Sequence, residues 1–564
     1  MRFLLASLAL LLTVPTQAQD RPPLDPGVRP VTRTFAITNA RVVPEPGRVL
    51  ERATVVVRNG LIEAVGEDVA VPFDAEVVEG DSLTVYAGFI DGLGHAGIAE
   101  SEDDEAERPR DPGNPPREAA GLTPDRDART LLDPDNSLVE ALRKLGFTVA
   151  HSVPHDGMLA GQGAVVLLAG ETPEAMVLRG ASSLFAQFDG ASGAYPATPM
   201  GIMAALRQQF RDAERRQTGA ALYADNPAGL DRPTYDPVLS ALPPSLGGTQ
   251  PVFFAVDDVL EGHRALEIAD ELGLSLVLGG LRESSMLTDK LRAAEVPVFA
   301  SLDLPERPEA DSTAADSLGV SAGEIFLTER RTRSYADVGD EVEALSARRR
   351  EAIGLYERNA LTLREADIPF GFATLGAKPS DVRTSLRRIV EAGLSEDDAL
   401  AALTTTPAAL LGLERSLGTV EAGKMANLVV TDGSYFDEET SIRFVFVDGE
   451  RFEVETDEGF DADAEVVAAG TWDYRVVTEG QTMEGTMTIA DDGGTLSGSV
   501  DAEGVGVVPM DDLDLDGNRL SFSVTSDAFG TITFSGLITG DTYAADLTGA
   551  NIPPLALSAT RRPG

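Results

Sequence analysis

Short apolar stretches at the start of the chain follow the period expected for β-strands. Residues 35–43 and 53–66 are rich in Val and Ile, and the Asn59-Gly60 pair predicts a tight hairpin turn within the second stretch. A further apolar run at residues 85–91 ends at Asp91 and passes into glycines and one histidine. The pattern therefore predicts a small β-structure that leads into a buried strand.

The centre of the chain, residues 86–413, alternates strand-like apolar runs with helical stretches. Strands are expected at residues 147–153, 164–169, 251–256, 274–278, 296–302 and 368–374. Helices are expected at residues 136–145, 200–215, 259–272, 341–366, 381–392 and 395–403, the last capped by Ser395. This alternation predicts an α/β fold whose parallel strands form a barrel.

The last part of the chain, residues 466–564, has a different pattern. Six short segments alternate apolar and polar residues, and turns such as Asp516-Gly517-Asn518 separate them. Short strands at this spacing predict an antiparallel β-barrel or a β-sandwich. The segment contains no His or Cys, and nothing in it indicates catalysis.

The net charge of the chain limits the classes of molecule that it is expected to bind. Asp and Glu outnumber Lys and Arg by 92 to 46, so the formal net charge is -46, which argues against nucleic-acid binding. Only four residues are lysine, namely Lys144, Lys290, Lys378 and Lys424. Strong acidity with scarce lysine is typical of proteins adapted to high salt, where self-repulsion is screened. An ordinary acidic secreted protein is the alternative.

The N-terminus has the features of a secretory signal peptide over residues 1–18. Arg2 precedes an apolar run at residues 3–14, and small residues precede an expected cleavage near Gln19. The apolar run is too short to span a bilayer, so we expect no membrane span. With no Cys in the chain, disulfides are absent. These features predict a periplasmic or secreted protein.

Three motifs carry a family resemblance. They are the run VYAGFIDGLGHAGI at residues 85–98, TTTPAALLGL at 404–413 and LGTVEAGKMANLVVTD at 417–432. Together they resemble the amidohydrolase superfamily, in particular its imidazolonepropionase and prolidase-like branch, over residues 35–454. The resemblance implies a (β/α)8 TIM-like barrel at residues 86–413, a composite β-sandwich from residues 31–85 and 414–456, and a separate C-terminal all-β domain at 466–564.

The resemblance also implies a catalytic metal that activates water. The family places histidines after the first, fifth and sixth barrel strands, often a carboxylated lysine on the fourth, and an aspartate after the eighth. At the matching positions this chain keeps His95 but has Leu93, Phe254, Gly279-Gly280 and Leu375. No lysine lies on a matching fourth strand. Most of the family's ligand positions are therefore degenerate.

Three histidines nevertheless follow predicted strands and are candidate metal ligands. His95 follows the first barrel strand, His151 ends the second, and His155 lies four residues later. Barrel active sites lie at the carboxyl ends of strands, so these histidines are expected at one mouth, where they would suit one Zn²⁺ ion. The alternative is that they only occupy positions at strand ends, and that no metal binds.

Two carboxylates and one amide complete the candidate site. Asp91 and Asp156 are the candidate general bases. Gln162, in a family-like glycine-rich stretch at residues 157–165, is the candidate for substrate binding.

Two functions stay open at the level of sequence. The first is an exported, metal-dependent hydrolase of amide or cyclic-amide C–N bonds, acting on a small molecule or a peptide-like substrate. The alternative is a non-catalytic binding or scaffold protein with the same fold, since apolar residues at ligand positions would fill the metal cavity. An oligomer is compatible with either function.

Overall fold

The computed structural model describes residues 34–99, 109–190, 194–307, 335–454, 464, 466–478, 481–491, 496–502, 506–526, 530–549 and 552–562. The predicted signal peptide lies outside these residues. The chain divides into two compact units, the first ending at Val454 and the second comprising residues 455–564. Among the described residues, no helix combines the length and the apolar character needed to cross a bilayer.

Strands that precede and follow the barrel in the sequence form one eight-stranded sheet. Its order is β16-β15-β14-β5-β1-β2-β3, with β4 beside β1. Its strands are β1 (Thr34–Glu45), β2 (Arg48–Arg58), β3 (Leu61–Gly66), β4 (Ala75–Glu79), β5 (Thr84–Ala87), β14 (Leu428–Thr431), β15 (Ile442–Val447) and β16 (Glu450–Glu453). The turn between β2 and β3 is Asn59-Gly60, with both residues at positive φ, as the sequence predicts. The segments before and after the barrel therefore combine as expected, but into one continuous sheet with its own apolar cluster, whereas a β-sandwich was predicted.

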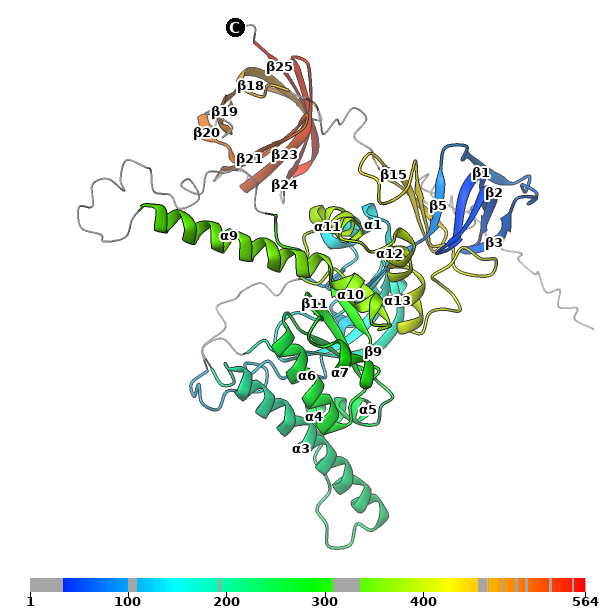
Figure 1. Cartoon of the computed structure of the whole chain (residues 1–564), viewed down its shortest axis with the longest axis vertical. Coiled ribbons are helices and arrows are strands. Elements are labelled where there is room, and N and C mark those ends of the chain that lie inside the picture. The colour runs from blue at the N-terminus through cyan, green and yellow to red at the C-terminus, as the bar shows by residue number, and fades with distance from the viewer. Residues whose placement is uncertain are drawn as a thin grey trace, which may run out of the picture. The chain divides into compact units, whose positions relative to one another are not determined.

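A second eight-stranded sheet, in the order β6 to β13, forms the barrel (Figure 1). Its strands are β6 (Phe89–Gly94), β7 (Phe147–Ser152), β8 (Leu159–Leu167), β9 (Val177–Gln187), β10 (Val252–Ala255), β11 (Leu276–Leu281), β12 (Val298–Ser301) and β13 (Phe370–Ala373). The first and last strands meet where the Leu375 N–H donates to the Leu93 carbonyl over 3.1 Å. The sheet is thereby nearly closed.

One barrel strand departs from the expected parallel alternation. β8 runs antiparallel to both β7 and β9. β7 leads directly into β8 through a turn that contains Asp156 and Gly157 at positive φ, without an intervening helix. β9 was not expected from the sequence. Only the second half of this strand is buried, so the strand as a whole lacks a continuous apolar pattern.

Helices connect the other barrel strands and flank them. They are α1 (Ser137–Lys144), α2 (Pro173–Met176), α3 (Pro199–Asp225), α4 (Pro237–Ala241), α5 (Pro243–Leu246), α6 (Val259–Leu272), α7 (Thr288–Ala293), α9 (Tyr335–Glu357), α10 (Asn359–Glu365), α11 (Pro379–Glu391), α12 (Glu396–Leu403) and α13 (Thr405–Leu410). The predicted cap of α12 is present, since Ser395 Oγ accepts from the Asp398 N–H over 3.1 Å.

The second unit is a nine-stranded antiparallel sheet in the order β20-β19-β18-β17-β25-β24-β23-β22-β21. Its strands are β17 (Gly470–Thr478), β18 (Gln481–Asp491), β19 (Leu496–Ala502), β20 (Gly506–Pro509), β21 (Asp511–Asp516), β22 (Arg519–Ser526), β23 (Gly530–Thr539), β24 (Thr542–Gly549) and β25 (Ile552–Arg561). The sheet curls around a separate apolar core that includes Trp472 and Tyr543 (Figure 1). The predicted separate antiparallel β-structure is thereby present as a single curled sheet.

Candidate functional site at the barrel mouth

A cavity of about 740 Å³ opens at the carboxyl ends of the barrel strands. Its wall contains residues at the ends of five strands: Gln187, Ala255 and Ser301 end β9, β10 and β12, Gly280 lies in the last part of β11, and Thr374 directly follows β13. Its volume is in the range of small-molecule sites, about 300–1,000 Å³. This mouth is where barrels of this class place their functional groups.

His95 and His155 lie together on the wall of this cavity. Their rings stack with centroids 3.7 Å apart and planes inclined by 24°. His95 Nδ1 donates to the Val153 carbonyl over 2.7 Å, which leaves Nε2 with the lone pair in the neutral ring. Burial lowers the pKa of His95 to about 4, and the neighbouring His155 acts in the same direction. His95 is therefore neutral near pH 7.

His151 lies inside the barrel, away from the other two histidines. Its Nδ1 donates to the Gly92 carbonyl over 3.1 Å, and its Nε2 accepts from the Ser183 hydroxyl over 2.8 Å. Burial lowers the pKa of His151 to about 4. Both ring nitrogens are thus engaged by the protein, and His151 is not among the residues that line the cavity. The structure thus places His151 at the end of β7 with partners inside the barrel, away from the cavity.

Asp91 is fully buried between the first and last barrel strands. One carboxylate oxygen accepts from the Thr374 N–H over 2.9 Å and from the Leu93 N–H over 3.3 Å. The other accepts from the Thr374 hydroxyl over 2.7 Å. Burial raises the pKa of Asp91 to about 6, although these three bonds act against the rise. The carboxylate holds β6 to the end of β13 and is not in the cavity wall.

The other two predicted site residues also lie apart from the cavity wall. Asp156 is exposed in the turn before β8. Gln162 lies on β8, where its N–H donates to the Arg126 carbonyl over 2.7 Å. Of the six residues that the sequence selects, the structure therefore brings only His95 and His155 to the cavity.

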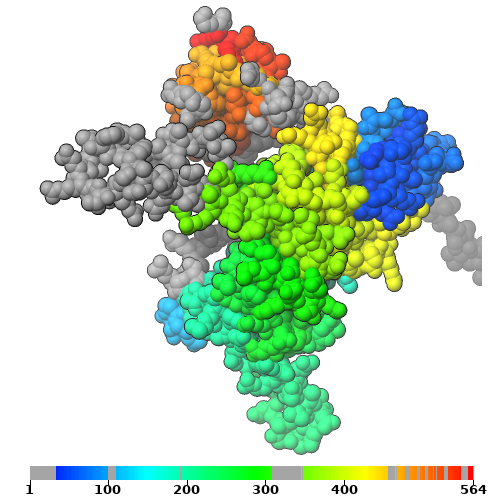
Figure 2. Space-filling model, in the orientation of Figure 1, coloured from blue at the N-terminus to red at the C-terminus, as the bar shows by residue number. Residues whose placement is uncertain are grey.

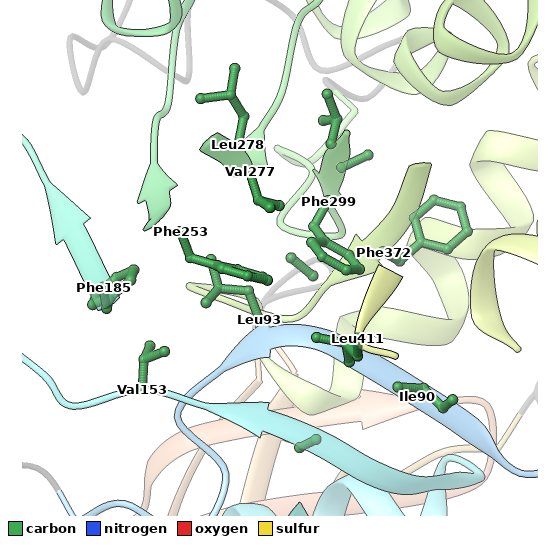
Figure 3. Packing of buried hydrophobic residues seen from close by; sticks show 14 of the residues in the cluster. Ile90, Leu93, Val153, Phe185, Phe253, Val277, Leu278, Phe299, Phe372 and Leu411 are labelled. Atoms are coloured by element: carbon green, nitrogen blue, oxygen red, sulfur yellow. The ribbon is translucent and has the colours of Figure 1, made fainter. Parts of the chain in front are cut away.

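Apolar side chains fill the barrel interior beneath the mouth (Figure 3). Leu93 packs so closely against β11 that a Cβ on Gly279 would lie 2.2 Å from its Cδ2. The Phe299 ring takes the space beside β6 and β13, where a Cβ on Gly92 would lie 1.9 Å from it. Figure 3 shows Leu93, Phe253 and Phe299 converging on this interior.

The structure corrects which residue at the end of β10 faces the cavity, for which the sequence analysis took Phe254. Side chains alternate along a strand. Phe253 contacts His151 with ring centroids 4.3 Å apart, and Ala255 lines the cavity. Phe254 instead packs against Phe188, with centroids 4.7 Å apart. The residue of β10 that faces the mouth is therefore Ala255, and it offers no ligand atom either.

Charged residues that the sequence analysis did not select also line the cavity. Asp189 follows β9, and Asp257 and Glu261 follow β10. Arg282 follows β11, the neighbour of β10, and pairs with Asp303, whereas Lys378 follows β13 across the mouth. β9 and β13 are the fourth and eighth strands of the order, so they stand on opposite sides of the barrel. Each of these charged residues comes within a few positions after a barrel strand. This position in the sequence is the signal that could have identified them as residues of the cavity wall.

Comparisons with known proteins find this barrel fold and, over part of the chain, a known family. Residues 356–454 match the model of the amidohydrolase family. A solved amidohydrolase from Thermotoga maritima MSB8 is 22% identical, with a TM-score of 0.58, and covers 74% of this chain and 100% of that one. The superfamily resemblance is thereby confirmed.

A more distant structure also matches. It is a prolidase complexed with N-methylphosphonate-L-proline, which is 15% identical with a TM-score of 0.41 and covers 74% of this chain and 99% of that one. No protein among the curated proteins compared with the chain matches it.

The residues at the mouth do not fit the metal centre that the fold implies. Among the described residues, no group of three His, Cys, Asp or Glu side chains is arranged to hold a metal ion. Leu93, Ala255, Gly279 and Leu375 occupy the strand ends where ligands would be needed. The predicted set of His95, His151 and His155 is divided, because His151 is bound within the barrel.

Proposed function

We propose that this chain binds a small peptide-like molecule at the mouth of an amidohydrolase-type barrel, without the metal centre of the family. The main observation behind this proposal is a ligand-sized cavity whose wall has charged groups. Among the described residues, this wall has no set of metal ligands. The proposal follows the non-catalytic alternative of the sequence analysis. Residues 1–18 support the further proposal that the protein is exported.

The distribution of charge supports a ligand with both a cationic and an anionic end. Asp189 and Asp257 are exposed on one side of the mouth, and Lys378 is exposed on the opposite side. Within the described part of the chain, these three side chains form no ion pair. An ammonium group at the aspartates and a carboxylate at Lys378 would each meet an opposite charge.

Hydrolysis of a C–N bond is the second candidate function. It is favoured by the neutral His95, whose Nε2 lone pair could accept a proton from water in the cavity. The family match at residues 356–454 is also compatible with hydrolysis.

Binding can be tested with dipeptides and with the same dipeptides N-acetylated or C-amidated, by calorimetry on the full chain. Lys378→Gln should weaken binding of the free-carboxylate forms about three- to tenfold and leave amidated forms unchanged. Lys290→Gln on α7 is the matched control, because Lys290 is exposed and is not among the residues that line the cavity. Equal effects of the two substitutions would contradict this binding mode.

Metal content and product formation distinguish the two candidate functions. Elemental analysis after incubation with Zn²⁺ should give much less than one ion per chain, equal in the wild type and in His95→Ala. The same dipeptides should remain intact in the presence of the protein. Stoichiometric Zn²⁺ that His95→Ala abolishes, together with cleaved products, would replace the binding proposal with the hydrolase.

A further inference from the structure

Helix α3 has two halves with different surroundings. Its buried residues are Ile202, Leu206, Phe210 and Ala213, which recur every three or four positions and form one face of the first half. No later residue of the helix is buried. The chain returns to the body at Asp236, which pairs with Arg117 over 2.8 Å. We call residues 214–235 the arm, and Figure 2 shows the far end of α3 as a narrow projection.

The arm is held by local hydrogen bonds. The Thr218 hydroxyl donates to the Glu214 carbonyl over 3.0 Å, and the Asn226 N–H donates to the Leu222 carbonyl over 3.0 Å. Gly219 lies within the helix, where glycine costs about 1 kcal/mol relative to alanine. Helical segments without packing are marginal in water. An additional surface that covers the arm would therefore stabilise it.

The composition of the arm is unusual for this chain. Residues 217–230 contain one charged residue, Asp225, although 24% of the whole chain is charged. Apolar side chains are exposed instead: Leu222 by 60%, Leu230 by 49% and Tyr235 by 80%. On a molecule with net charge -46, this surface avoids the like-charge repulsion that opposes contact between copies.

We infer that the arm is a dimerisation element that packs against the arm of a second copy of this chain, in antiparallel orientation. Gly219 lies three positions before Leu222, on the same side of the helix, and its lack of a side chain lets a second helix approach closely there. Arg215 and Arg216 precede these residues and Asp225 follows them. Antiparallel pairing centred on Ala220 and Ala221 therefore brings Arg215 of each copy, which pairs with Asp212 of its own helix over 3.3 Å, near Asp225 of the other copy.

This symmetric arrangement also accounts for the exposed leucine. About a two-fold axis between positions 220 and 221, Leu222 of one copy faces Gly219 of the other. A large side chain then meets a position that has none, which suits a self-complementary interface. The inference is independent of the proposed ligand, because it uses no residue of the cavity wall.

The first test is the oligomeric state of the full mature chain by sedimentation velocity across the micromolar range. The wild type should be a dimer, and Leu222→Glu should raise its dissociation constant at least about tenfold. Leu260→Glu on α6 is the matched control, because Leu260 is also 60% exposed, and it should change nothing. Since both positions are exposed, unchanged circular dichroism will show that the variants fold.

The second test locates the contact directly. The chain has no Cys, so one introduced thiol reports one position. Ala221→Cys should give a covalent dimer with a short bismaleimide, and Ala293→Cys, at an exposed helical alanine on α7, should not. A monomeric wild type, a dimer that Leu222→Glu leaves intact, or equal cross-linking at both positions would overturn the inference.

Discussion

Asp91 shows at the residue scale how burial changes the role of a carboxyl group. The sequence places it at the end of a barrel strand, which suggests a general base. The structure shows both oxygens occupied by donors from Thr374 and Leu93. A fully buried carboxylate that does not itself line the cavity is not placed to take a proton from a bound molecule. Asp91 instead links the two strands where the barrel closes.

Asp91 should give the stability a distinct dependence on pH. Its pKa is about 6 in the folded chain and 3.8 in the reference state, so the folded state favours the protonated form. This contribution is fully present below pH 3.8 and is lost as the pH rises through 6. Relative to the wild type, Asp91→Asn should therefore gain up to about 3 kcal/mol in free energy of unfolding between pH 4 and 7.

Chemical denaturation at several pH values, followed by circular dichroism at 222 nm, measures this difference. Asp156→Asn is the control, because Asp156 is exposed in the turn before β8. A constant difference between Asp91→Asn and the wild type would contradict the assignment of Asp91 as a buried link.

At the element scale, strand β12 supplies the side chain that fills the barrel. Phe299 is fully buried, and its ring stacks with that of Phe253, with centroids 5.8 Å apart. The glycines of β6 and β13 leave the space that this ring occupies, since a Cβ on Gly371 would lie 2.7 Å from it. Glycines at these positions therefore serve the packing of the interior.

Phe299→Ala should remove about 3–5 kcal/mol of stability, because neighbouring strands cannot collapse into the space left by the ring. Phe73→Ala is the matched control, since the Phe73 side chain is fully exposed, and it should change the stability by less than about 0.5 kcal/mol. Equal and small effects of the two substitutions would show that the barrel interior is not packed around Phe299.

At the scale of the whole molecule, the two units have separate apolar cores and different spectroscopic signals. The only tryptophan of the chain, Trp472, is buried in the second unit. The helices of the described residues all belong to the first unit. Fluorescence therefore reports on the second unit, and circular dichroism at 222 nm reports mainly on the first.

Fluorescence and circular dichroism should give different denaturation midpoints, because the two cores are expected to unfold separately. Phe299→Ala should lower the midpoint seen by circular dichroism and leave the fluorescence midpoint unchanged. If both midpoints shift together, the two units unfold as one cooperative structure. The measurement is best made at high salt, in view of the net charge of -46.

The sequence by itself determined most elements and the family resemblance. Local patterns are sufficient for these, because periodicity, capping residues and the Asn59-Gly60 turn act over a few neighbouring positions. The prediction of 259–272 as a helix agrees with α6 at both ends. The apolar residue at one expected ligand position, Leu93, was also visible, because the motif at residues 85–98 fixes its alignment.

Only the tertiary structure decided which of the selected side chains share one site. His151 and His155 are four residues apart, yet one is bound by Ser183 inside the barrel and the other stacks on His95 at the mouth. The antiparallel direction of β8 and the partner of Asp91, 283 residues away, were equally hidden. Side-chain direction and long-range partners depend on how distant strands pack, and no local pattern records that packing.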